Sequence, residues 1–284
     1  MIENLSIIGE SINDSIPTTR SYYDTEDYAA IRELAKFQAD GGARYIDVNV
    51  GARSADVMVK AAQAAQEGGK KPLSIDSPDL ALAEAGLAVC DRALGKPILN
   101  SISPLRTEMF DLYAKYPFRP ILLISENVSD SGERFSCHTA DETYDAALSL
   151  FELARKAGIP NDDIIFDPGI APIATDTEGN LPRLIETLRR IQANPEMAGV
   201  HASVGLSNFT VMLPPRRKDG SPVKGPLESG FLTRALPLGL DYVIGSVKRN
   251  YRLLTEGDPA LECVDFCIEK SGMETLMIVR RFYR

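Results

Sequence analysis

Eight short apolar runs, separated by longer segments with helical patterns, constrain the fold of this chain more than any other feature. The runs consist of neighbouring Ile, Val and Leu residues rather than alternating apolar and polar ones, which is typical of strands buried on both faces. The expected strands are residues 5–10, 43–49, 72–76, 97–100, 119–125, 163–167, 199–207 and 242–246.

The segments between the runs carry helix signals. Residues 25–42 end in Gly41-Gly42, a common helix stop, and residues 180–194 place leucines on one face. Residues 139–158 open with Thr139 and Glu142 at the spacing of a capping box. Strands that alternate with helices in this way form parallel βαβ units with right-handed crossovers.

Two architectures fit this pattern, a closed (β/α)₈ TIM barrel and an open doubly wound sheet. No G-x-G-x-x-G follows the first run and no P-loop sequence occurs, so nothing marks a nucleotide-binding open sheet. The number of runs favours the barrel, and 284 residues lie within the range of that fold. Because no linker or composition shift divides the chain, we expect one barrel domain over residues 1–284.

Polar side chains stand where six of the eight expected strands end. They are Glu10 and Asn13, Asp47 and Asn49, Asp76, Asn100, Asp167, and Ser207 with Asn208. A single Asp or Asn at such a place commonly caps the next helix or closes a turn. Since the carboxyl ends of barrel strands all meet at one face, the set as a whole predicts a polar pocket there.

The chemistry of these strand ends is selective, because Asp and Asn dominate and Lys, Arg and His are missing. A phosphate site would need cations or glycine-rich amides, and a metal site would need His or crowded carboxylates. We therefore expect no bound metal. Carboxylates and amides around a rim suit a neutral heterocycle with N–H donors and carbonyl acceptors, such as a 2-amino-4-oxo pterin ring.

Six ordered motifs also resemble a known family. They are "IGESIN", "YIDVNVG", "LSIDS", "ILNSIS", "FDPGIAP" and "VGLSN", and the resemblance covers the chain from Ile8 to about Ser246. They look like those of the pterin-binding methyltransferases that move a methyl group between tetrahydrofolate and a corrinoid protein. Dihydropteroate synthases share the barrel, but an Arg-x-His near the last strand, part of their signature, is not found.

The resemblance implies that Asp76, Asn100 and Asp167 hydrogen-bond the pterin and that Asn208 lies near the methylated nitrogen. Asp47, Asn49 and Ser207 are expected at the same rim as further substrate-binding residues. Two departures concern the entrance and the docking of a partner. Ser11 stands where the family often has Arg, and the segment after Asn208 is longer and richer in Pro.

The resemblance also implies the substrates and partners. Tetrahydrofolate or methyltetrahydrofolate is the small-molecule substrate, and the corrinoid (a cobalamin) takes or gives the methyl group. Because the chain lacks Asp-x-His-x-x-Gly, the motif of corrinoid-binding modules, the cobalt is expected on a separate corrinoid protein that docks over the barrel mouth. Family members are commonly homodimers, and we expect a homodimer here.

Methyl transfer from a tertiary amine requires a proton or strong hydrogen bonds on the nitrogen before a nucleophile takes the carbon. His138 and His201 are the only histidines. His201 precedes Asn208 by most of a strand, and His138 lies just before a helix, so neither is expected to be the essential acid. Asn208, helped by water, is expected to stabilise the protonated nitrogen.

Composition excludes several other functions. A net charge of −9 argues against binding to the phosphate backbone of nucleic acid. No apolar run approaches the roughly 20 residues that span a membrane, and no secretion signal is visible, so a cytoplasmic protein is expected. The four cysteines are expected to be structural thiols.

Two questions stay open at this level. Residues 209–230 hold Arg216, Arg217, Lys218 and Lys224, and they form either a solvated loop or a lid or docking strip. The rivals to the methyltransferase are a dihydropteroate synthase-like pterin enzyme and a non-catalytic folate-binding protein. The direction of methyl transfer and the upstream methyl donor cannot be inferred from the sequence.

Overall fold

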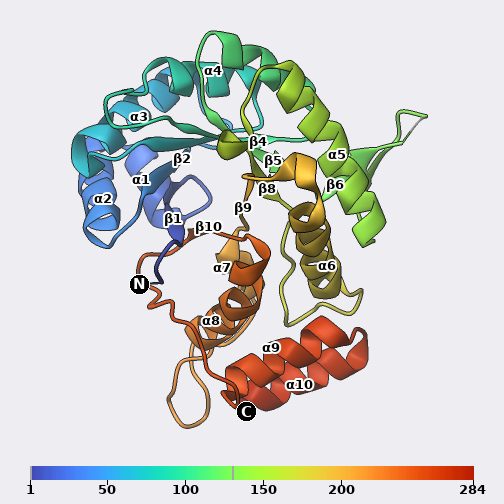
Figure 1. The fold of residues 1–284 in the computed structure, drawn as a ribbon. Coiled ribbons are helices and arrows are strands. Elements are labelled where there is room, and N and C mark those ends of the chain that lie inside the picture. Colours follow the sequence, from blue (N-terminus) through green and yellow to red (C-terminus); the bar gives the residue numbers. More distant parts are fainter. Residues whose placement is uncertain (1, 130) are drawn as a thin grey trace.

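The predicted barrel is confirmed by the structure, a computed structural model that describes residues 2–129 and 131–284. Eight parallel strands lie side by side in the order β10-β1-β2-β3-β4-β5-β8-β9 (Figure 1). Their bounds are β1 (Ser6–Asn13), β2 (Tyr45–Asn49), β3 (Leu73–Asp76), β4 (Ile98–Ile102), β5 (Arg119–Leu123), β8 (Ile165–Asp167), β9 (His201–Ala202) and β10 (Tyr242–Gly245).

The ring closes between β9 and β10 through a few backbone contacts rather than a full ladder. Ala202 forms a parallel bridge with Leu240, and Gly205 forms one with Ile244. The amide of Ile244 donates to the carbonyl of Val204 at 3.0 Å. The barrel is therefore nearly closed, with β9 as its shortest strand.

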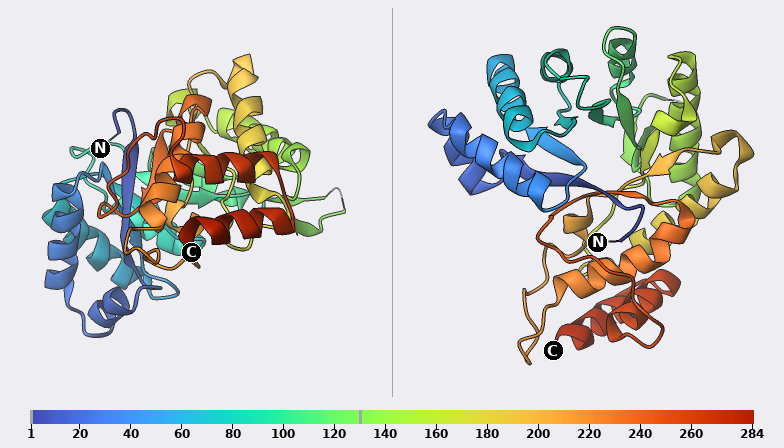
Figure 2. Two further views of the ribbon diagram at one scale, coloured as in Figure 1. Left: turned by 90° about the horizontal axis from the view of Figure 1, so that it is seen from below. Right: turned by 60° about the vertical axis from the view of Figure 1, so that its left-hand side comes forward.

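Helices surround this ring (Figures 1 and 2). The α-helices are α1 (Pro17–Asp24), α2 (Tyr28–Asp40), α3 (Ala55–Gly69), α4 (Leu80–Ala88), α5 (Ala140–Lys156), α6 (Asn180–Ala193), α7 (Leu206–Phe209), α8 (Lys224–Ala235), α9 (Pro259–Glu269) and α10 (Met273–Tyr283). Short 3₁₀ helices are η1 (Thr107–Ala114), η2 (Asn161–Asp163), η3 (Pro195–Met197) and η4 (Leu236–Leu238). The predicted capping box of α5 is present, with Thr139 and Glu142 each accepting a hydrogen bond from the other's backbone amide.

Apolar side chains fill the interior of the barrel. Ile8, Ile98, Ile121, Ile165 and Tyr242 form one buried cluster. They come from β1, β4, β5, β8 and β10, and β1 is not hydrogen-bonded to β4, β5 or β8, so these side chains meet inside the ring. Larger clusters pack between the strands and the helices. The interior is thus a packed core and not a pore.

The strand predicted over residues 199–207 is wrong in its extent. Regular pairing ends at Ala202, and the backbone turns at Gly205 so that the amide of Asn208 donates to the carbonyl of Gly205 at 2.9 Å. Ser207 and Asn208 therefore lie on the single turn of α7 and not on a strand.

One further feature was not predicted from the sequence. An antiparallel hairpin of β6 (Glu126–Val128) and β7 (Arg134–Ser136) connects β5 to α5 and projects from the barrel, at the right of Figure 1.

Candidate functional site

A cavity of about 640 Å³ lies at the carboxyl ends of the strands. Its polar lining includes every predicted site residue except Asn49, namely Asp47, Asp76, Asn100, Asp167, Ser207 and Asn208. Apolar side chains complete the wall, among them Ile16 from the loop after β1 and Val211 from the segment after α7. These six polar side chains therefore lie around one cavity at the carboxyl ends of the strands, where the sequence places a polar pocket.

Asn49 orients one of the cavity carboxylates. Its Nδ2 donates to Oδ2 of Asp76 at 2.9 Å, while its Oδ1 accepts from the amide of Gly51 at 2.8 Å. Both ends of the amide are thus used, and the contact with Gly51 fixes which end faces Asp76. Asn49 supports Asp76 from the side and does not itself line the cavity.

Asp47 and Asp76 lie close together at the ends of adjacent strands. Asp47 is buried, and burial together with the nearby charge of Asp76 raises its pKa well above the usual range. Burial also raises the pKa of Asp76, whereas the hydrogen bond from Asn49 lowers it. Two carboxylates that share a low-dielectric site cannot both ionise freely. The pair therefore favours a state with a single negative charge.

Asp167 ends β8 on the other side of the cavity. Its Oδ1 accepts from the amide of Gly169 at 2.8 Å, and burial raises the pKa of this carboxyl to about 7. Near neutral pH the side chain is therefore present in both protonation states. Such a group can accept hydrogen bonds from an N–H edge when it is ionised.

Glu10 also lines the cavity, and the sequence placed it at a strand end without assigning it a role. It lies next to an irregularity in the pairing of β1 with β2. Its Oε1 accepts a hydrogen bond from Oγ of Ser207 at 2.5 Å, and burial raises the pKa of the Glu10 carboxyl. Only the three-dimensional fold brings these residues together, because 197 positions separate them in the chain.

Within residues 2–129 and 131–284 no Lys, Arg or His side chain lines this cavity. Arg106 lies behind the rim, where its Nε donates to the carbonyl of Ser101 and its Nη2 to Oγ of Ser101, both at 3.1 Å. The positive charge of Arg106 lowers the pKa of Asp76. The cavity itself presents acceptors, amides and apolar surface, which is a poor arrangement for a phosphate group.

Neither histidine lines the cavity. His201 begins β9 at the opposite, amino-terminal end of the barrel, where its Nδ1 lies 2.5 Å from Oδ2 of Asp241. Its Nε2 lies 3.1 Å from the carbonyl oxygen of Asp162. His138 is exposed just before α5, and its amide donates to Glu142 at 2.7 Å.

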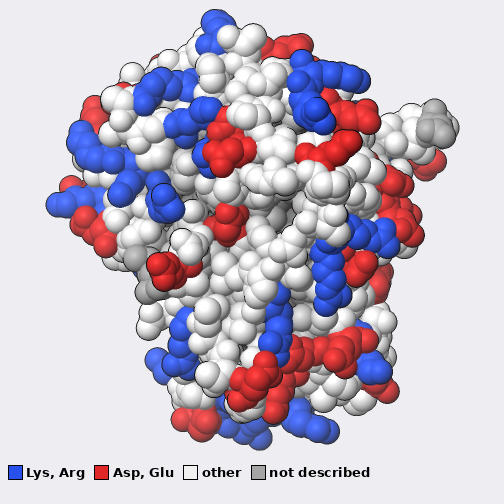
Figure 3. Space-filling model, viewed as in Figure 1, with Lys and Arg blue, Asp and Glu red and all other residues white. Residues whose placement is uncertain are grey.

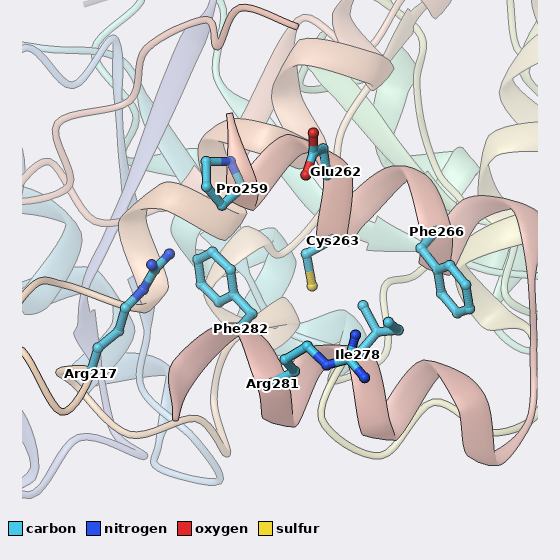
Figure 4. A pocket seen from close by; sticks show the side chains of 8 residues that line it. All are labelled: Arg217, Pro259, Glu262, Cys263, Phe266, Ile278, Arg281 and Phe282. Atoms are coloured by element: carbon cyan, nitrogen blue, oxygen red, sulfur yellow. The ribbon is translucent and has the colours of Figure 1, made fainter. Parts of the chain in front are cut away.

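The basic segment after α7 has an ordered shape in the structure. Arg216 pairs with Pro222 in an antiparallel bridge, and the amide of Arg217 donates to the carbonyl of Ser221 at 2.8 Å. The guanidinium of Arg217 lies 3.7 Å from the ring centre of Phe282 in α10. Figure 4 shows this contact beside a second cavity, of about 370 Å³, which α9 and α10 also line. The guanidinium of Arg217 therefore packs against α10.

Among the described residues no group of three or more His, Cys, Asp or Glu side chains is placed to hold a metal ion. No helix in the described part of the chain combines the length and apolar character that crossing a membrane requires. On the face shown in Figure 3, basic and acidic side chains are interspersed.

Comparison with known proteins gives a consistent result. The family described as "Pterin binding enzyme" matches residues 18–245. A methylcorrinoid:tetrahydrofolate methyltransferase of Eubacterium limosum is 27% identical over 247 residues, which cover 84% of this chain and 83% of that protein.

Solved structures with a similar fold include two synthases. A dihydropteroate synthase of Xanthomonas albilineans with 4-aminobenzoic acid has a TM-score of 0.54 at 17% identity, covering 84% of each chain. The 7,8-dihydropteroate synthase of Vibrio fischeri has a TM-score of 0.53 at 15% identity, covering 98% of this chain and 90% of the other. At these identities the likeness concerns the fold alone, and it agrees with the barrel described above.

Proposed function

The chain belongs to the pterin-binding enzymes, and on this premise we propose that it is a methyltransferase that moves a methyl group between tetrahydrofolate and a corrinoid protein. The methyl group leaves or reaches N5 of the folate. The cobalt of the corrinoid belongs to a co-substrate that a separate protein carries to the barrel mouth.

The donor and acceptor set of the cavity supports this proposal most directly. The carboxylates of Asp76 and Asp167 can accept hydrogen bonds from the N–H groups of a pterin, and the amide of Asn100 can both donate and accept. Asn49 holds Asp76 in place for this contact, and the buried Asp47 lines the same cavity from the adjacent strand. The apolar residues Ile16 and Val211 can cover the faces of a flat ring.

The position of Asn208 supports its role at the reacting nitrogen. Its side chain lies on α7 at the wall of the cavity, and the residue is exposed rather than packed in the core. An exposed amide can turn its N–H or its carbonyl towards a ligand as the charge of that ligand changes. We assign to Asn208 the stabilisation of the protonated N5, from which a nucleophilic Co(I) takes the methyl group in line with the carbon–nitrogen bond.

Similarity to the methyltransferase of Eubacterium limosum supports methyl transfer rather than another pterin reaction. A dihydropteroate synthase would have to bind the pyrophosphate of its pterin substrate, and the described lining of the cavity supplies no cation for that group. The cytoplasmic location and the homodimer stay predictions from the sequence and the resemblance.

The proposal is tested by mixing the purified protein with tetrahydrofolate and methyl-Co(III) cobalamin, either free at millimolar concentration or bound to a corrinoid protein. The expected result is the appearance of Co(I) absorbance with equimolar methyltetrahydrofolate. Binding of folate without any transfer would indicate a non-catalytic folate-binding protein. Condensation of p-aminobenzoate with a pterin pyrophosphate would indicate the synthase.

A further inference from the structure

Glu10 lies beside the short helix that carries Asn208. Its Oε1 accepts the hydrogen bond from Ser207, the residue immediately before Asn208, and all three side chains line the cavity. Within the part of the chain that the structure describes, Oε2 of Glu10 has no hydrogen-bond partner. Since Oε1 is used by Ser207, Oε2 is the oxygen of Glu10 that is available to a ligand in the cavity.

Charged and titratable groups from several elements surround Glu10. Arg249, from the loop after β10, lowers its pKa, and Arg249 also pairs with the fully buried Glu228 of α8 through Nε and Oε2 at 3.2 Å. Asp47 from β2 and Tyr251 interact with the charge of Glu10 as well. Burial outweighs Arg249 and Ser207, so the pKa of Glu10 is raised and the carboxyl keeps its proton to higher pH than an exposed glutamate.

A proton must reach the methylated nitrogen, and the cavity offers few sources for it. The described lining contains no His, Lys or Arg side chain. Asp76 and Asp167 are assigned above as acceptors of the pterin N–H groups, and Asn208 has no proton to give away. Asp47 also lines the cavity, but it is buried and shares its site with Asp76 on the neighbouring strand. Glu10 is the cavity carboxyl that is hydrogen-bonded to the residue next to Asn208, so it remains for proton transfer on that side.

We infer that Glu10 stores the proton that N5 of the folate gains before its methyl group leaves, and that it takes this proton back in the reverse reaction. This inference rests on the proposed methyl transfer. The Oε2–H bond of Glu10 breaks and its proton bonds to N5. The carbon–nitrogen bond then breaks with its electron pair remaining on N5, and the methyl carbon bonds to the electron pair of Co(I), which becomes methyl-Co(III).

The experiment compares single-turnover methyl transfer from methyltetrahydrofolate to cob(I)alamin, free or protein-bound, between about pH 5.5 and 9. General acids typically contribute about 10²–10⁴-fold to a rate, so Glu10→Gln is expected to slow transfer at least about 100-fold. The dissociation constant of the Glu10→Gln variant for methyltetrahydrofolate should differ from that of the wild-type protein by less than about threefold. Glu228→Gln is the matched control, because it alters a neighbouring buried carboxyl that does not line the cavity.

A second variant gives a readout that a structural role would not produce. The hydrogen bond from Ser207 lowers the pKa of Glu10. Ser207→Ala should therefore move the basic limb of the pH–rate profile to higher pH, and Glu10→Gln should abolish that limb.

The outcomes separate the inference from the proposed function. A wild-type protein that binds methyltetrahydrofolate but transfers no methyl group overturns both. Two results overturn the role of Glu10 alone, provided that the wild-type protein is active. One is a Glu10→Gln rate within threefold of the wild-type rate. The other is a basic limb of the pH–rate profile that Ser207→Ala leaves unchanged. An equal loss of rate in Glu228→Gln would also overturn the role of Glu10, because neutralising any buried carboxyl nearby would then slow the transfer.

Discussion

Gly205 offers a way to displace the side-chain amide of Asn208, to which we assign a catalytic role, without removing it. A Cβ at this glycine would lie 2.9 Å from Nδ2 of Asn208 and 3.8 Å from its Cγ, with no other heavy atom beyond its chain neighbours nearby. The backbone of Gly205 has φ −72° and ψ 78°, close to the common inverse γ-turn conformation, and its φ is negative, so alanine can adopt it. Gly205→Ala should therefore keep the fold and move only the end of the Asn208 side chain.

The size of the effect follows from this distance. Non-bonded heavy atoms prefer about 3.5 Å or more, so the amide must shift by roughly 0.6 Å. Since a misplacement of about 1 Å can cost about 10²-fold in rate, Gly205→Ala is expected to slow methyl transfer about tenfold. Folate affinity should change less than about threefold, because the substitution leaves Asp76, Asn100 and Asp167, the proposed pterin-binding residues, untouched.

The assay is single-turnover transfer at saturating folate, together with a folate titration and thermal unfolding. Gly225→Ala is the matched control, because that glycine lies in α8 with open space around its Cβ position. It should leave the rate unchanged, because Gly225 does not line the cavity. A normal rate in Gly205→Ala, with Asn208→Ala impaired, would refute the requirement for a precisely placed amide.

Three further predictions concern Asn208, Asp167 and His201. Asn208→Ala should slow transfer about 100-fold or more while folate affinity falls only a few fold, and an equal loss of both would contradict its role at the transition state. Pterin binding should weaken as the pH falls through about 7, where Asp167 gains a proton, and isothermal titration of Asp167→Asn should show a flatter pH dependence. Asp241 raises the pKa of His201, so the stability from this contact is fully present below about pH 6.5 and is lost as the pH rises through the folded pKa. In urea unfolding, the loss of unfolding free energy in His201→Gln relative to wild type should therefore be largest at pH 5.5 and smallest at pH 8.5. A loss that is the same at both pH values would argue against the pairing of His201 with Asp241.

Local sequence patterns determined the barrel and the chemistry of its rim. Continuous Ile, Val and Leu runs predict strands buried on both faces, and Thr139 with Glu142 predicts the start of α5, because each signal depends on residues a few positions apart. The carboxyl ends of parallel strands necessarily share one face. Asp47, Asp76, Asn100 and Asp167 could therefore be placed at one pocket from their positions in the chain.

The tertiary structure decided which of these side chains meet and what each one faces. Asn49 contacts Asp76 instead of the cavity, and Arg217 packs on Phe282 of α10. Glu10 reaches Ser207 only because β1 pairs with β10, the ring closes between β10 and β9, and α7 follows β9. Such contacts depend on strand register, on the tilt of neighbouring elements and on how deeply each group is buried. None of these quantities is encoded within the few residues over which a local pattern can be recognised.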